Sequence, residues 1–229
     1  MRIIDLSKSF NGKKIFENIS IDFMPGRIYS IFGKNGIGKT TLLNILNGNL
    51  SYDQGEIELE TDREIILLEE NSIPFEFMTA EEFIKTTFLF KKRSIDIKEK
   101  NLLFKLLEFQ PEEKMIKDFS KGMKSKLCII IALLSKPDIL LLDEPFSDID
   151  LMSFRNISKI LRNKNYNMTI VFSTHIAKIA FELADSIIYL EEVGIKEVEN
   201  TFKNSENLEK YILLEMSEKK KNIEEEKHV

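Results

Sequence analysis

The sequence of 229 residues has no tryptophan, two histidines and a single cysteine, and none of its apolar runs exceeds eight residues. A membrane-spanning helix needs about 18 consecutive apolar residues, so no segment is expected to cross a bilayer. The lone Cys128 excludes an intrachain disulfide framework and favours a reducing compartment. The first ten residues lack the apolar stretch and cleavage site of a secretory signal, so a cytoplasmic location is expected.

An excess of positive charge is also missing, because 33 Lys and Arg residues face 38 Asp and Glu residues. The formal net charge of −5 argues against nucleic acid as a partner, since binding along a duplex requires cations that neutralise phosphates. Apolar residues make up 43% of the chain, which is enough to bury a core. The length suits one large domain, or one domain that carries a subdomain.

Hydrophobic periodicity predicts an α/β fold with a mixed, mainly parallel sheet. Residues 2–23 alternate strand-forming and polar residues and break at Asn11-Gly12, which predicts an N-terminal antiparallel pair. A short strand from Gly55 is expected to join this region, so that the first third forms one mixed sheet. The remaining expected strands span 27–32, 64–68, 139–142, 168–173 and 186–190. The last three alternate with helices, an order typical of parallel sheets.

Residues 71–135 have a mainly helical pattern and are expected to form an inserted helical subdomain. The segment Thr79-Ala80-Glu81-Glu82 is a capping box, which predicts a helix start. Residues 216–229 are dominated by Glu and Lys and are expected to be a solvated tail outside the domain.

A glycine-rich motif, GKNGIGKT at residues 33–40, matches G-x-x-x-x-G-K-[ST] between an apolar strand and a helix. Glycines let backbone N–H groups turn toward a phosphate, while Lys39 can reach the outer phosphates and Thr40 can bind Mg²⁺. An ordinary glycine-rich turn is a poor alternative in this setting. The motif predicts a P-loop NTPase, with nucleotide-binding residues Gly33, Asn35, Gly36, Gly38, Lys39, Thr40 and Thr41.

An acidic pair, Asp143-Glu144, follows the apolar strand at 139–142. The carboxyl end of a strand in a parallel sheet is where such folds bind ligands. Asp143 is expected to hold Mg²⁺, and Glu144, which points in another direction, to polarise the attacking water.

A third motif, Phe119-Ser120-Lys121-Gly122-Met123, precedes this pair, with Ser120 lying 23 residues before Asp143. Ser120 suits a helix N-cap and Gly122 leaves the backbone open, so a helix over 121–135 can present its positive end to an anion. A plain helix start is the alternative for the pentapeptide alone. With all three motifs, residues 1–215 resemble the nucleotide-binding domain of an ABC transporter, whose signature loop reads L-S-G-G-Q.

The resemblance implies roles for four further residues. Asp150 ends a segment similar to the family's D-loop, and Phe10 stands where the family stacks an aromatic ring on adenine. His175 resembles the switch histidine and is expected to act in catalysis with Glu144. Glu69 replaces the Q-loop glutamine; its carboxylate can bind Mg²⁺ or water, and it adds negative charge beside the phosphates. Alternatively, His175 is a structural or surface residue and Phe10 is buried in its strand.

The resemblance also implies ATP and Mg²⁺ as cofactors and a head-to-tail dimer with a second ATP-binding subunit, identical or different. In that dimer, Ser120 and Gly122 of one subunit contact the ATP held by the other. Lys121 and Met123 depart from the signature and are expected to alter this contact; alternatively, Lys121 adds favourable charge near a phosphate. A separate transmembrane permease subunit would form the transport path and hold the chain at the inner face of the cell membrane.

Phenylalanines are concentrated shortly after Glu69. Some of them are expected to line an apolar groove for a cytoplasmic helix of the permease. The alternative is that they form the core of the helical subdomain. The residues are Phe75, Phe77, Phe83, Phe88 and Phe90.

These patterns favour an ATP-hydrolysing subunit that powers transport, with export favoured over import. One alternative is a degenerate regulatory subunit that binds ATP in a heterodimeric ABC system, which Glu69 and the altered signature favour. The other is a soluble ABC ATPase without a transport role. The transported substrate cannot be inferred from this chain, since the membrane subunit lines the path.

Overall fold

Two β-sheets form the core of the protein. The computed structural model describes residues 1–69, 73, 75–162, 167–191 and 194–214. In the first sheet β1 (Arg2–Phe10) lies between β2 (Lys13–Asp22) and β4 (Gln54–Glu58), and both pairs are antiparallel. The predicted N-terminal antiparallel pair is thus confirmed.

The second sheet has six strands in the order β5-β6-β7-β3-β8-β9, of which the first five run parallel and β9 is antiparallel to β8. This confirms the α/β class with a mixed, mainly parallel sheet. Strands β6 and β8 have the predicted limits. The strands are β3 (Ile28–Phe32), β5 (Ile65–Leu68), β6 (Ile139–Leu142), β7 (Thr169–Thr174), β8 (Ser186–Leu190) and β9 (Ile195–Glu199).

The expectation of one mixed sheet in the first third of the chain is wrong. Strand β4 joins the antiparallel sheet, whereas β5 pairs with β6 in the parallel one. The sequences of the two strands explain the difference: QGEIE is polar and mostly exposed, as suits an edge strand, and IILL suits a parallel sheet covered on both faces. Strand β9 was not predicted.

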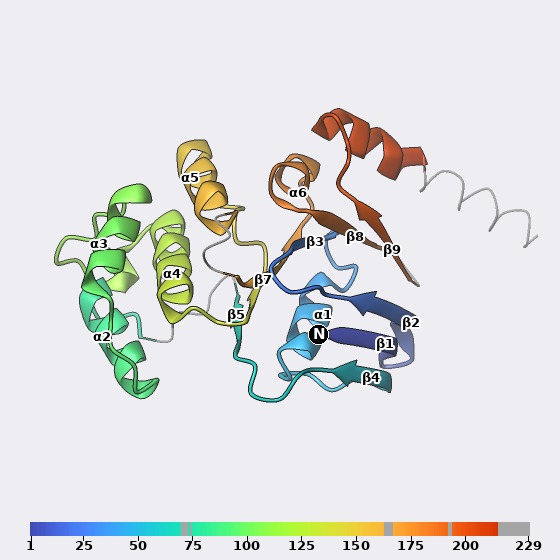
Figure 1. The fold of residues 1–229 in the computed structure, drawn as a ribbon, viewed down its shortest axis with the longest axis horizontal. Helices are drawn as coiled ribbons and strands as arrows, with labels where there is room; N and C mark the ends of the chain where they lie inside the picture. The colour runs from blue at the N-terminus through green and yellow to red at the C-terminus, as the bar shows by residue number, and fades with distance from the viewer. Residues whose placement is uncertain (70–72, 74, 163–166, 192–193, 215–229) are drawn as a thin grey trace, which may run out of the picture.

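Helix α1 (Lys39–Leu46) lies between the two sheets (Figure 1). Its Leu42 and Leu43 are fully buried in a cluster with Leu6 and Phe16 of the antiparallel sheet and with Leu141 of β6. The helix that begins at the glycine-rich loop is therefore fixed from both sides.

The other helices contribute to a second core cluster, which includes residues of the opposite face of the six-stranded sheet. Helices α2 to α4 group together at one end of the molecule (Figure 1). The predicted capping box is confirmed, since Thr79 Oγ1 accepts from Glu82 N at 3.3 Å and Glu82 Oε2 accepts from Thr79 N at 2.8 Å. The helices are α2 (Ala80–Phe90), α3 (Ile97–Leu106), α4 (Lys121–Ser135), α5 (Leu151–Leu161) and α6 (Ala177–Leu183), with a 3₁₀ turn at Ile116–Asp118 and further helical residues at 205–214.

The proposed subdomain limits include residues 71, 72 and 74, which lie outside the described residues, as does the predicted tail at 216–229. Within the described ranges, none of the helices combines the length and the apolar character needed to span a membrane.

The pairing of β1 with β4 depends on the absence of a side chain at Gly55. Its φ is +101°, and a Cβ there would lie 2.6 Å from both Asp5 O and Leu6 Cα. Both atoms belong to the backbone, so the clash cannot be relieved by rotating a side chain.

We predict that Gly55→Ala lowers the free energy of unfolding by about 3 kcal/mol, from overpacking and from the strained φ. The matched control is Gly194→Ala, where a new Cβ meets no atom within 4 Å, and its effect should stay within about 0.5 kcal/mol. Urea denaturation of both variants measures the difference. Equal stabilities of the two variants would contradict the role given to Gly55.

Candidate nucleotide site

The glycine-rich loop connects β3 to α1 and is held by neighbouring strands. Gly33 N donates to Thr174 O of β7 at 3.3 Å. Gly38, the N-cap of α1, has φ +117°, and a Cβ there would lie 2.4 Å from Ile15 Cγ2 of β2. A side chain at Gly38 would therefore force the Ile15 side chain to move, so this glycine has a steric role in addition to its predicted contact with phosphate.

Lys39 is buried inside the loop. Its Nζ donates to Gly33 O at 2.9 Å and Lys34 O at 3.2 Å, and lies 3.5 Å from Asn35 Oδ1. It also forms an ion pair with Glu144 Oε1 at 3.1 Å. The predicted phosphate ligand and the predicted base are thus adjacent. Of the other predicted loop residues, Gly36 has φ +78° and Thr41 is half-buried in the first turn of α1.

Asp143 joins three segments at the carboxyl end of β6. Its Oδ2 accepts from Thr40 Oγ1 at 2.7 Å, and its Oδ1 accepts from Ser173 Oγ at 2.6 Å. Ser173 also accepts from Glu144 N at 2.8 Å. Sequence reasoning missed Ser173, although its place near the end of a strand, two residues before His175, was a usable signal.

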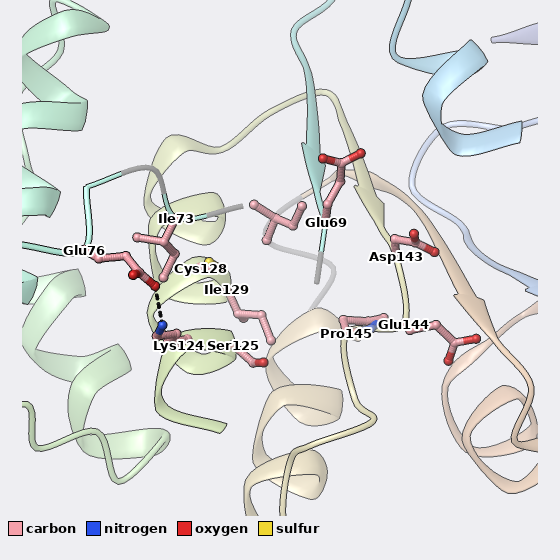
Figure 2. A pocket seen from close by; sticks show the side chains of 11 residues that line it. Glu69, Ile73, Glu76, Lys124, Ser125, Cys128, Ile129, Asp143, Glu144 and Pro145 are labelled. Atoms are coloured by element: carbon pink, nitrogen blue, oxygen red, sulfur yellow. Dashed lines mark hydrogen bonds and ion pairs between the residues drawn. The ribbon is translucent and has the colours of Figure 1, made fainter. Parts of the chain in front are cut away.

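Glu144 has an unusual backbone conformation, with φ +46°. A non-glycine residue in this region costs about 1–2 kcal/mol, so the surrounding structure must hold it there. Its carboxylate oxygens lie 3.2 and 3.3 Å from His175 Nδ1, while Lys39 pairs with it from the other side. Figure 2 shows the Asp143 and Glu144 side chains at the end of β6, away from Lys124 and Cys128.

Glu69 follows β5, the neighbour of β6, and its side chain is aligned by α1. Asn44 Nδ2 donates to Glu69 Oε1 at 3.1 Å, and it also lies 3.1 Å from Thr40 O, one helical turn earlier. Asn44 is a second residue that sequence reasoning missed, and its i+4 spacing from Thr40 was the available signal. Glu69, Asp143 and Glu144 line one side of a pocket whose other side is formed by α4 (Figure 2).

Three residues that were predicted to contact ATP lie outside the glycine-rich loop and the acidic pair: Ser120, Gly122 and Asp150. Ser120 caps α4, as predicted, by accepting from Met123 N at 3.2 Å, and a Cβ on Gly122 would lie 2.9 Å from Asp148 O. Asp150 caps α5 and accepts from Ser153 N at 2.9 Å and Ser153 Oγ at 2.6 Å, which lowers its pKa to about 2. In the part of the chain that the structure describes, no hydrogen bond or ion pair joins these three residues to the glycine-rich loop.

Phe10 lies at the end of β1 with 43% of its surface exposed, so the alternative of a buried strand residue is wrong. His175 is also exposed, at the end of β7, and its Nδ1 faces Glu144.

Comparison with known proteins agrees with this arrangement. Residues 16–147, more than half of the chain, match the family model described as ABC transporter. The chain is 32% identical to the lantibiotic transport ATP-binding protein SrtF of Streptococcus pyogenes, over 91% of this chain and 94% of the relative. It is 30% identical to the methionine import ATP-binding protein MetN of Clostridium tetani, over 83% of this chain and 66% of the relative.

Among solved structures, the fold is similar to the dimeric structure of MJ0796, a bacterial ABC transporter cassette, with a TM-score of 0.73 and 23% identity over 88% of this chain and 99% of that one. The predicted P-loop NTPase fold is thereby confirmed. The family match and the similarity to SrtF over 94% of its length show that the chain belongs to the ABC transporter family. It is an ATP-binding subunit that hydrolyses ATP to power transport.

Proposed function

We propose that the chain hydrolyses ATP with Glu144 as the general base and drives export through a separate permease. The observation that carries this proposal is the position of the Glu144 carboxylate, 3.1 Å from Lys39 Nζ and 3.2 Å from His175 Nδ1. Lys39 is the residue expected to bind the outer phosphates, so a water near the γ-phosphate comes within reach of Glu144.

In the proposed mechanism, Glu144 accepts the proton of the attacking water. His175 orients the carboxylate, and the bond from Glu144 N to Ser173 Oγ fixes the backbone beneath it. Lys39 exchanges its contacts with loop carbonyls for phosphate oxygens when ATP binds, which also releases Glu144 from the ion pair. The glycine-rich loop supplies backbone N–H groups to the remaining phosphate oxygens.

The residues present suit Mg²⁺. Thr40 Oγ1 and Asp143 Oδ2, 2.7 Å apart, are both hard oxygen ligands. Mg²⁺ commonly takes one or two protein ligands and completes its shell with phosphates and water, so a full protein cage is unnecessary. The described residues contain no cluster of three or more His, Cys, Asp or Glu residues that would form such a cage. When bound, the ion would neutralise charge on the phosphates, and Glu69 would contact its outer shell.

We propose a head-to-tail dimer because one chain holds the two halves of the site apart. Ser120, Gly122 and Asp150 would contact ATP bound to the second subunit, and the α4 N-terminus, which has no acidic residue in its first turn, suits an anion there. Residues 1–215 would form this ATPase domain, with the helical subdomain at about 71–135. The permease would hold it at the inner face of the cell membrane, in the cytoplasm.

Two arguments rank the alternatives. The assembled Lys39–Glu144–His175 cluster favours a hydrolytic subunit over a degenerate regulatory one. For the direction of transport we propose export, since the chain spans 94% of the relative named for lantibiotic transport.

We predict that Glu144→Gln retains ATP binding and lowers turnover by about 10²–10⁴-fold, the usual contribution of a general base. Phosphate release and ATP affinity, measured on the same samples, separate the two effects. Glu113→Gln, an exposed position away from the site, is the control and should behave as the wild type. Wild-type turnover in the Glu144 variant would refute its assignment as the base.

Glu69→Gln should raise turnover about fivefold, because it removes a negative charge beside the triphosphate in a solvated setting. The amide oxygen can still accept from Asn44, so the side chain keeps its position. Steady-state ATPase rates of this variant and of Glu113→Gln provide the measurement. A fall in rate would mean that the carboxylate itself is needed at this position.

The phenylalanines after Glu69 fall into two groups. Phe83 and Phe88 are buried, so the alternative of a subdomain core is correct for them. Phe75, Phe77 and Phe90 are 42%, 79% and 75% exposed. We propose that Phe75 and Phe77, which follow Glu69 in the chain, form the surface that receives a cytoplasmic helix of the permease.

Phe77→Asp should leave folding and ATP binding intact and reduce recovery of the chain with its native membranes by about tenfold or more, because a charge at the centre of an apolar contact is costly. Leu213→Asp changes an apolar residue that is 64% exposed and serves as the control. Membrane co-sedimentation measures the bound fraction. Unchanged binding by the Phe77 variant would exclude this surface.

A further inference from the structure

Lys8 is a buried lysine for which the proposed mechanism has no role. Only 6% of its surface is exposed, although it lies on β1 in the small antiparallel sheet. An ammonium group in such a place is costly unless it is paired. Among the described residues, its Nζ pairs with Asp53 Oδ1 at 3.5 Å and lies 4.9 Å from the centroid of the Phe10 ring.

The contact with Phe10 is a cation–π interaction on one face of the ring. Alternate residues of a strand share a face, which brings the Lys8 and Phe10 side chains together. The ring remains 43% exposed even with the ammonium against it. The Phe10 ring therefore presents a flat apolar face to solvent, while the Lys8 ammonium lies against its other face.

Asp53 fixes this arrangement. Its second carboxylate oxygen, Oδ2, accepts from Ser9 N at 2.6 Å, and Asp53 N donates to Ser7 O at 2.9 Å. The aspartate thus holds the backbone on both sides of Lys8 while it pairs with the lysine. The position of the ammonium under the ring is set by three contacts at the end of β1.

The ring also lies near the phosphate loop. Phe10 pairs with Lys13 of β2, and Ile15, two residues further along β2, touches Gly38. Two strand residues span about 7 Å, so the ring and the loop are separated by a distance that a nucleoside can bridge.

We propose that Lys8 is a positioning residue for the nucleotide base. Its ammonium holds the Phe10 ring in place and draws π-electron density from it, so that the exposed face of the ring stacks more strongly on an electron-rich purine. The inference rests on the proposed function and on the role that the family resemblance implies for Phe10, which is to stack on the adenine of ATP. It requires that Lys8 act on the base and not on the phosphates.

The experiment compares two probes by calorimetry in the presence of Mg²⁺: ATP and inorganic tripolyphosphate, which has no base. Lys8→Met keeps the length of the side chain and removes its charge. We expect it to weaken ATP binding about fivefold and to leave tripolyphosphate binding unchanged. Lys8→Arg, which keeps the cation, should restore most of the ATP affinity.

A double-mutant cycle isolates the contact with the ring. In a Phe10→Leu background, Lys8→Met should have no further effect on ATP binding. The matched control is Lys14→Met, which removes an exposed lysine from the same hairpin, where it pairs with Glu17, and should not change either affinity. If Lys8→Met does not fold, Lys8→Gln keeps a hydrogen-bond donor for Asp53 and replaces it in the test.

Three results would overturn the inference: unchanged ATP binding in Lys8→Met, an equal loss for ATP and tripolyphosphate, or additive effects of the Lys8 and Phe10 changes. These are distinguishable from failure of the proposed function. Loss of ATP affinity in Phe10→Leu supports the base platform whatever Lys8 does, and the turnover of Glu144→Gln tests hydrolysis separately.

Discussion

The carboxylate of Asp143 accepts hydrogen bonds from Thr40 and Ser173, and the rest of the nucleotide site depends on these two bonds. A buried carboxylate is stable only when its oxygens are satisfied, so β6, β7 and the start of α1 must meet at this point. Ser173 extends the network by accepting from Glu144 N, which fixes the next residue in its left-handed conformation. The proposed Mg²⁺ ligand Asp143 and the proposed base Glu144 are therefore positioned by one hydrogen-bond network.

The parts of the site that could be predicted from the sequence are those formed by residues that are adjacent in the sequence. The glycine-rich loop and the Asp143-Glu144 pair each lie on one continuous segment, and each follows an apolar strand that is recognisable by itself. Ser173 and Asn44 were missed because their roles depend on which strands become neighbours. Ser173 meets Asp143 only because β7 inserts between β6 and β3, and that order is not written in any single segment.

The same reasoning explains the error in the first third of the chain. Strands β4 and β5 are separated by a few residues, and their local patterns do not say that they belong to different sheets. The exposure of Phe10 also depends on strand pairing, since Phe10 lies beyond Ser7, the last residue of β1 that pairs with β4. The roles of Ser120, Gly122 and Asp150 remain predictions, because they concern a second subunit.

Those three residues nevertheless form one structural unit. The first turns of α4 face the segment before α5, where Gly122 approaches Asp148 O, and Lys126 pairs with Asp150 at 3.6 Å. A ligand that contacts Ser120 would thus also affect the start of α5. In the proposed dimer, ATP bound to one subunit would therefore face two neighbouring helix N-termini of the other.

The central proposal is that ATP is enclosed between two ATP-binding subunits, taken here as two copies of this chain. It is tested most directly by the mass of the Glu144→Gln chain, measured by size-exclusion chromatography with light scattering, with and without Mg-ATP. The account predicts the monomer mass of 26.7 kDa without nucleotide and twice that mass with it. A mass that stays at the monomer value under saturating ATP would contradict the claim that this chain alone supplies both halves of the site.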